Sequence, residues 1–151
     1  MQPAKASKIA LLALGVLLST PSFAQAHLDL QGLHGHVVYV DFWASWCTPC
    51  RQSFPWMKAL ESAYRSQGLS VIAVNLDHDR QDAERFLETF QPNFAVVFDP
   101  AGALAQRFKV LGMPTSVLID REGRVRYQHV GFLVSQRAEY ERQVRSLLAE
   151  K

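Results

Sequence analysis

The sequence predicts an α/β fold in which a central mixed β-sheet is flanked by helices. Two observations support this prediction. From residue 36 onward, strand-like apolar runs alternate with segments of helical periodicity, and the last two strand-like runs are separated only by the turn REG. Alternation implies parallel strands joined by crossover helices, whereas a short turn implies an antiparallel hairpin. The 151 residues, 48% hydrophobic and 20% charged, suit one globular domain.

The first predicted strand covers residues 36–44, a run of β-branched and aromatic side chains interrupted by one acid, Asp41. The segment 48–66 carries apolar residues three or four positions apart, which predicts a helix. Gly68 follows it and is expected to end it, because glycine readily adopts the left-handed conformation of a helix C-terminus.

A second buried strand is predicted at residues 69–76, where the sequence reads LSVIAVNL. The next segment, 79–90, has helical periodicity, and Asp79 is a suitable N-cap because its carboxylate can accept from the first free N–H groups. A third strand at residues 93–100 follows. This helix and strand lie between the first two strands and the final hairpin.

A short helix is predicted at residues 102–110, where the sequence reads GALAQRFKV. Two strands, 114–120 and 124–130, flank the REG turn and should pair as a hairpin. The chain closes with a helix at residues 139–149, whose apolar residues recur at helical spacing. The predicted order is β-α-β-α-β-α-β-β-α.

The first residues differ from the rest of the chain. Lys5 and Lys8 precede an unbroken apolar run at residues 9–18, and small residues at cleavage-type spacing follow. This arrangement predicts that residues 1–26 are a secretory signal peptide and that the protein is periplasmic. The run is shorter than the roughly 20 residues that span a bilayer, although an uncleaved membrane anchor stays open.

Cleavage is expected after Ala24 or Ala26, which leaves residues 27–151 as the folded domain. Loss of the two lysines of the signal peptide reduces the 16 basic residues to 14, equal to the 14 acidic ones. A formally neutral domain argues against nucleic acid as a partner.

Cys47 and Cys50 are the only cysteines, and they stand as C-x-x-C. They can be a structural staple, half of a metal site or a redox pair. A disulfide between residues three apart closes a small loop and constrains the unfolded chain little, which disfavours a staple. A zinc site needs about four ligands, and the chain adds only scattered histidines. Arg51 after the second cysteine excludes the C-x-x-C-H haem attachment pattern.

Position gives the two thiols different roles. If the helix begins near Cys47, unpaired backbone N–H groups and the helix dipole favour its thiolate form. Cys50 lies one turn deeper, close enough for a disulfide. An exposed thiolate at the first position could attack a partner's disulfide, and the sheltered thiol could then resolve the mixed disulfide.

Asp41 is the second informative residue. A carboxylate is costly to bury ionised in a strand otherwise made of apolar residues, so burial would raise its pKa and suit it to exchange protons with a nearby thiol. Position alone leaves open whether the side chain is buried or solvated at the strand end.

The segment VDFWASWCTPC resembles the active site of thioredoxins, and Met113-Pro114-Thr115, directly before a strand, resembles the cis-proline loop of that fold. The segments RQSFPWMKAL, DAERFLETFQPNFAVVFDP and GMPTSVLIDREGRVRYQHVGF are similar, more narrowly, to exported thiol–disulfide oxidoreductases of the TlpA/ResA type. The resemblance covers about residues 30–149 and implies a thioredoxin-like fold with an extra helix–strand insertion.

The resemblance implies that Cys47 is the attacking thiolate, Cys50 the resolving thiol and Asp41 the buried acid that assists it. Pro114 would be the cis-proline that shapes the substrate groove, and Trp46 the aromatic beside the nucleophile. The other residues expected to bind substrate are Thr48, Pro49, Met113 and Thr115.

Three departures from the family pattern stand out. Many TlpA/ResA members carry a glutamate three residues after the second cysteine, where this chain has Ser53. Thioredoxins pair the buried acid with a lysine in the next strand, where alignment gives Ala73. Without that cation, Asp41 should be more strongly desolvated. Few residues precede the first strand, so the N-terminal hairpin of many relatives is expected to be shortened or absent.

The expected function is reduction of protein disulfides in the periplasm, without a cofactor, by a monomer that a membrane-embedded thiol donor re-reduces. Thr48-Pro49 between the cysteines lacks the histidine of strongly oxidising relatives, which favours a reductase. Substrates could belong to cytochrome c maturation or to an oxidase copper site. A thiol peroxidase would need a threonine where Ala44 stands. The alternative that stays open is a copper-binding or chaperone module that uses the dithiol as a soft-metal ligand pair.

Overall fold

The computed structural model describes residues 28–150 and contains the predicted elements in the predicted order. The strands are β1 (Val37–Trp43), β2 (Leu69–Asn75), β3 (Ala95–Phe98), β4 (Thr115–Ile119) and β5 (Val125–Val130). The helices are α1 (Thr48–Tyr64), α2 (Arg80–Phe90), α3 (Ala103–Arg107) and α4 (Arg137–Ala149), with 3₁₀ turns at Arg65–Gln67 and Val134–Gln136. The predicted signal peptide and its cleavage sites lie outside the described residues.

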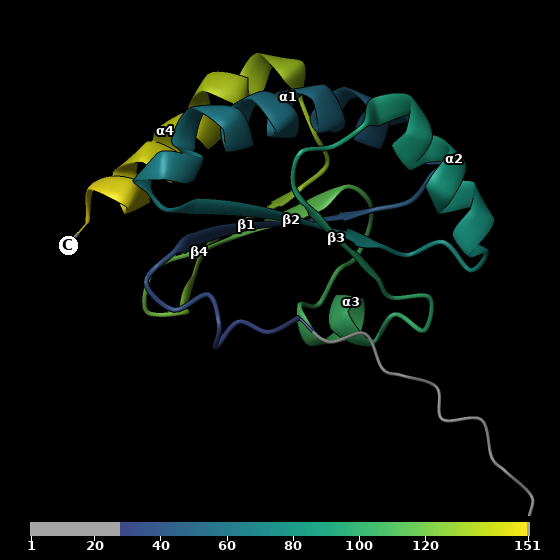
Figure 1. Cartoon of the computed structure of the whole chain (residues 1–151), viewed down its shortest axis with the longest axis horizontal. Helices are drawn as coiled ribbons and strands as arrows, with labels where there is room; N and C mark the ends of the chain where they lie inside the picture. The colour runs from purple at the N-terminus through teal and green to yellow at the C-terminus, as the bar shows by residue number, and fades with distance from the viewer. Residues whose placement is uncertain (1–27, 151) are drawn as a thin grey trace, which may run out of the picture.

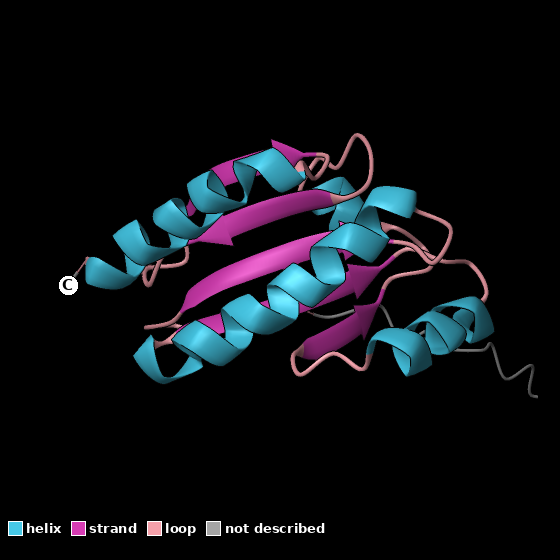
Figure 2. Cartoon of the chain, turned by 90° about the horizontal axis from the view of Figure 1, so that it is seen from above, coloured by secondary structure: helices cyan, strands magenta, loops and turns pink. Residues whose placement is uncertain are grey.

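The strands form one mixed sheet in the order β3-β2-β1-β4-β5. β1, β2 and β3 run parallel, whereas β4 is antiparallel to both β1 and β5. Figure 2 shows the strands side by side beneath the long helices. The α/β class and the C-terminal hairpin are therefore confirmed, and β1 lies at the centre, where both of its edges are paired.

Helices cover both faces of the sheet (Figure 1). α1, α2 and α4 lie on one face, and α3 lies on the other. The alternation of β1 matches this division, because Tyr39 and Trp43 belong to the apolar cluster under α1. Val40 and Phe42 belong to the cluster on the α3 side. Every residue of β1 is buried, as expected for a central strand covered on both faces.

Local chemistry sets where the helices begin and end. Asp79 caps α2, since its carboxylate accepts from the backbone N–H of Gln81 at 2.9 Å, as predicted. Gly68 adopts a φ of 97° after the 3₁₀ turn that follows α1, which ends the helix where the sequence indicated.

The helix predicted at residues 102–110 is shorter than expected. Three consecutive N–H groups at the start of α3 donate to the carboxylate of Asp99 at 2.8–3.1 Å, which fixes its beginning. Its end is set by Lys109, whose φ of 54° is incompatible with a continuing right-handed helix.

Within the described part of the chain, no strand precedes β1, in line with the expected loss of an N-terminal hairpin there. Residues 28–36 instead form turns, and Leu28 packs into the apolar cluster on the α3 side. None of the helices in residues 28–150 combines the length and apolar character needed to cross a membrane.

Candidate active site

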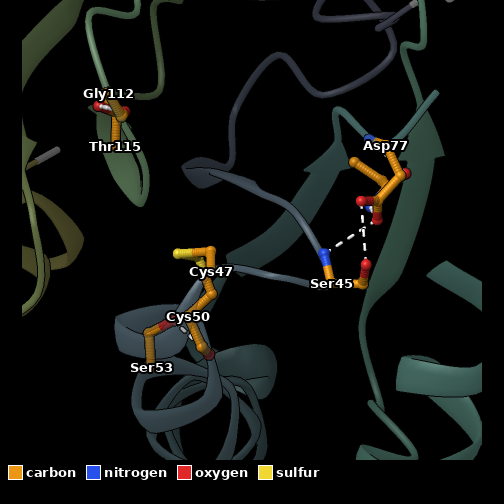
Figure 3. Close-up of a disulfide and its surroundings, with 8 residues drawn as sticks. Ser45, Cys47, Cys50, Ser53, Asp77, Gly112 and Thr115 are labelled. Carbon is orange, nitrogen blue, oxygen red and sulfur yellow. Dashed lines mark hydrogen bonds between the residues drawn. A yellow bond between two sulfur atoms is a disulfide. The ribbon is translucent and has the colours of Figure 1, made fainter. Parts of the chain in front are cut away.

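The two cysteines are joined where β1 gives way to α1. Cys47 is the N-cap residue of α1 and Cys50 lies in its first turn. Their sulfurs are 2.06 Å apart and their Cα atoms 5.3 Å apart, so the pair forms a disulfide at the predicted helix start (Figure 3). The position places the disulfide beside the free N–H groups of the helix N-terminus.

The two cysteines differ little in exposure in the oxidised form. Cys47 is 4% exposed and Cys50 is fully buried, and both belong to the apolar cluster under α1. The expectation of an openly exposed nucleophile is therefore wrong for this state, because the disulfide holds Cys47 against the cluster that encloses Cys50. Cys47 is nevertheless the one of the two that reaches the surface.

The neighbouring residues surround the disulfide with exposed side chains. Trp46 is 71% exposed, and Thr48 and Pro49 are exposed as well. Met113 is half-buried and packs against the cluster that contains both cysteines. These four predicted substrate-binding residues therefore present surface close to the sulfurs.

The peptide bond between Met113 and Pro114 is cis, as the resemblance implied. Thr115 pairs with Phe42 near the end of β1, so this loop lies at the same end of the sheet as Cys47. Pro114 and Thr115 are buried, and the Thr115 hydroxyl donates to the Gly112 carbonyl at 2.6 Å (Figure 3). The Thr115 side chain thus holds the loop and does not offer a free group to a partner.

An exposed apolar rim at this end of the sheet, which was not predicted, is formed by Leu111, Val130 and Leu133. They are 91%, 65% and 55% exposed. The N–H of Gly131 donates to the Pro114 carbonyl at 2.7 Å, which joins this rim to the cis-proline loop. In the sequence, the only indication of this rim was Leu111, an apolar residue directly before Gly112.

Asp41 is buried, with 2% of its surface exposed, and this settles the question that its position left open. It lies between Tyr39 and Trp43 on the face covered by α1, and its Oδ2 has no hydrogen-bond partner among residues 28–150. Burial raises the pKa of Asp41 well above its ordinary value. The carboxyl therefore holds its proton to an unusually high pH.

The predicted absence of a cation beside Asp41 is confirmed on β2. Ala73 is the direct partner of Asp41 in the parallel pair and is fully buried. On the other side, the direct partner is Ser116 of β4, which is 6% exposed. Residues paired across strands share one face, so Asp41 lies between a methyl group and a hydroxyl group, with no charge in either position.

Ser53 occupies the position where many TlpA/ResA members carry a glutamate. It is 1% exposed, and its hydroxyl donates to the carbonyl of Cys50 at 3.1 Å (Figure 3). The small side chain satisfies its hydroxyl within the helix. A glutamate side chain held at this buried position would lose the hydration of its carboxylate, at a desolvation cost.

A buried clamp holds the loop that leads to Cys47. The Asp77 carboxylate accepts from the backbone N–H and the hydroxyl of Ser45 at 2.9 and 3.0 Å, and from the Asn75 amide at 2.7 Å (Figure 3). Asp77 is 5% exposed, and its role was not predicted from the sequence. Its signal was an Asn and an Asp directly after a buried strand, where side chains often bind nearby backbone.

The cysteine pair has no metal-binding companions in the part of the chain that the structure describes. No three side chains among the His, Cys, Asp and Glu residues of 28–150 come together as a candidate metal site. The disulfide thus lies among aromatic side chains at the same end of the sheet as the cis-proline, and Asp41 is buried on the same face of the sheet.

Comparisons with known proteins agree with this geometry. Residues 18–144 match the Redoxin family model. Thiol-disulfide oxidoreductase ResA of Bacillus subtilis is 34% identical over 98 residues, which cover 65% of this chain and 55% of that protein. ResA of Geobacillus thermodenitrificans is 32% identical over 119 residues, which cover 76% of this chain and 68% of that protein.

Among solved structures, a candidate thiol:disulfide interchange protein DsbE from Chlorobium tepidum is 49% identical, with a TM-score of 0.78. The match covers 80% of this chain and 85% of that one. The chain spans only about half the length of the B. subtilis ResA that it matches. The family model and the G. thermodenitrificans relative cover enough to define the family. The chain therefore belongs to the Redoxin family, as a thioredoxin-like protein of the TlpA/ResA type.

Proposed function

We propose that this protein is a periplasmic thiol–disulfide oxidoreductase that reduces disulfides of other proteins through Cys47 and Cys50. The observation that carries the proposal is the Cys47–Cys50 disulfide at the start of α1, at the same end of the sheet as the cis Met113–Pro114 peptide bond. The names of the relatives, thiol-disulfide oxidoreductase and thiol:disulfide interchange protein, describe the same chemistry.

The reaction begins with both cysteines reduced. The Cys47 thiolate attacks one sulfur of the substrate disulfide, a mixed disulfide forms, and the other substrate sulfur leaves as a thiolate that takes up a proton. The Cys50 thiolate then attacks the Cys47 sulfur and releases the second substrate thiol. Two electrons pass to the substrate, and the Cys47–Cys50 disulfide remains, as in the structure described above.

Asp41 acts in the second half of this reaction. Cys50 is buried and must lose its proton before it can attack, and a buried carboxylate on the same face of the sheet is a suitable acceptor. Because burial raises the pKa of Asp41, its proton affinity is closer to that of a thiol than an exposed carboxylate's would be.

A reductase in an oxidising compartment needs electrons from outside it. The N-terminal segment, with Lys5 and Lys8 before an apolar run, supports export, and a membrane-embedded thiol donor would re-reduce the disulfide. Cytochrome c maturation and the copper site of an oxidase both need reduced thiols in that compartment and are the candidate pathways. The domain works as a monomer in this proposal.

The test traps the mixed disulfide. In the Cys50→Ser variant, Cys47 can attack a substrate but nothing resolves the product, so covalent complexes that a reductant releases should accumulate in cells. The Cys47→Ser variant is the matched control, since its remaining thiol is buried. Absence of trapped proteins, together with failure of the reduced wild type to cleave a model disulfide, would falsify the proposed function.

Direction is tested by redox titration of the wild-type pair. A reductase should have a potential on the thioredoxin side of the range that runs from about −270 mV for thioredoxin to about −120 mV for DsbA. A value near the upper end would assign the protein as an oxidase. The assignment as a thiol–disulfide oxidoreductase would survive that result, but the reductase assignment would not.

A further inference from the structure

A pocket of about 300 Å³ lies between α2 and the residues that flank the cysteine pair in sequence. Trp46, directly before the first cysteine, and Arg51, directly after the second, line it from the active-site side. Asp82, Arg85 and Phe86 line it from α2, the helix of the insertion. The mechanism proposed above uses none of these side chains except Trp46, so the pocket is free for another role.

The charges around the pocket are unbalanced. Arg51 lies over the rings of Phe86 and Phe90, with its guanidinium carbon 5.4 and 5.9 Å from their centroids. It forms no ion pair within residues 28–150. Arg85 pairs with Asp82. The walls therefore carry two guanidinium groups and one carboxylate, and the aromatic rings hold Arg51 without satisfying its N–H groups.

None of the carboxylates on α2 or in the loop 76–79 before it forms an ion pair with Arg51, and most of them are engaged elsewhere. Asp77, behind Ser45, accepts hydrogen bonds on both oxygens from the clamp described above. Asp79 caps the N-terminus of α2, and Glu84 pairs with Arg80. The free donors of Arg51 are thus available to an anion that enters from outside.

We propose that this pocket binds a glutamate or aspartate side chain of the substrate polypeptide close to its reacting disulfide, so that acidic substrates are preferred over neutral ones. The proposal rests on the proposed function. A guanidinium donates two parallel hydrogen bonds to a carboxylate, and a pocket beside the disulfide admits only residues near the reacting cysteine. The exposed Trp46 ring also lines the pocket and offers an apolar surface on which the peptide packs.

The test compares two disulfide-linked peptides that differ only by Glu or Gln beside one cysteine. The wild type should reduce the Glu peptide with a kcat/KM about 3- to 10-fold higher, through KM, as expected for a charge pair that is partly exposed. Arg51→Gln and Arg85→Gln should each reduce this ratio towards one, and so should 1 M salt. Arg145→Gln is the matched control, because Arg145 is an exposed cation on α4 outside the pocket.

The proposal is overturned if the wild type does not distinguish the peptides, or if the preference persists in both pocket variants. An equal slowing of both peptides by Arg51→Gln, with an unchanged ratio, also overturns it, since Arg51 would then act on the thiols. If neither peptide is reduced, the proposed function fails separately. In that case, binding of cysteine-free peptides with Glu or Gln tests the pocket directly. A shift of the Trp46 indole NMR signal that requires both the Glu side chain and Arg51 supports the proposal. Absence of such a shift overturns it.

Discussion

The burial of Asp41 makes a quantitative prediction about stability and pH. In the Asp41→Asn variant, a side chain of nearly the same volume replaces the carboxyl but cannot ionise. Wild-type folding requires either that Asp41 keep its proton or that a carboxylate be buried between Ala73 and Ser116 without a charge partner. The Asn side chain of the variant stays uncharged at every pH, so the free energies of unfolding of the two proteins should differ increasingly as the pH rises.

The sign follows from proton binding. Burial raises the pKa of Asp41 in the folded chain, so above the unfolded-state pKa of about 3.9 the folded protein binds more protons than the unfolded one. The free energy of unfolding of the wild type therefore falls as the pH rises from about 3.9 to the raised folded-state value. In that window the loss approaches about 1.4 kcal/mol per pH unit, and the variant does not share it.

Urea unfolding of the oxidised proteins between pH 4 and pH 8 measures this difference, since an uncharged denaturant leaves the electrostatics intact. Glu88→Gln, which replaces an exposed acid on α2 and keeps Asp41, is the control, and its free energy of unfolding should stay within about 0.5 kcal/mol of the wild-type value at every pH. If the difference between the wild type and Asp41→Asn stays constant across this range, the carboxyl ionises equally easily in both states and the desolvation argument is wrong.

Three further predictions concern the stability of the fold. Asp77→Ala should lower the free energy of unfolding by about 1–3 kcal/mol, because it leaves the buried donors of the clamp without an acceptor. Ser45→Ala should lower it by less, and equal losses for the two variants in urea titrations would contradict this reasoning. Phe86→Ala should lower the free energy of unfolding by about 3–5 kcal/mol, because the ring packs against three other aromatic rings. A calorimetric melting temperature within about 2 °C of the wild-type value would refute this prediction. Burial raises the pKa of Asp120, but hydrogen bonds from Arg124 and a second arginine outweigh it and lower the pKa to about 2. As the pH falls from 4 to 2, the contribution of Asp120 to the wild-type free energy of unfolding should therefore decrease by about 1–2 kcal/mol. Asp120→Asn should lack this decrease when both proteins are unfolded in urea.

Much of the fold could be predicted because local patterns and tertiary structure agree. The run at residues 36–44 is apolar on both faces, and β1 is buried on both faces. Asp79 and Gly68 each combine a characteristic residue type with a helix boundary, and the structure has both boundaries there. At each of these two helix boundaries, one characteristic residue was enough for a correct prediction.

The parts that could not be predicted depend on pairs distant in sequence. Ser45 and Asp77 are 32 positions apart, and neither local segment indicates that the Asp77 carboxylate binds the loop that contains Ser45. Arg51 over Phe86 is a similar case, since the aromatic residue reads simply as core. The burial of Cys47 in the oxidised form also depends on the cluster around Cys50 and not on the motif itself.

The register of the sheet places Asp41 in a row of polar side chains that crosses three strands. Asp41, Ser116 and His129 are successive direct partners across β1, β4 and β5, and the Ser116 hydroxyl lies 3.3 Å from Nδ1 of His129. Burial lowers the pKa of His129, which favours the neutral form of its imidazole. The one basic group in this polar row thus does not replace the cation missing at Ala73. Desolvation therefore dominates the ionisation of Asp41, and a change in the hydration of this row should alter proton transfer at Cys50 more than a change in surface charge.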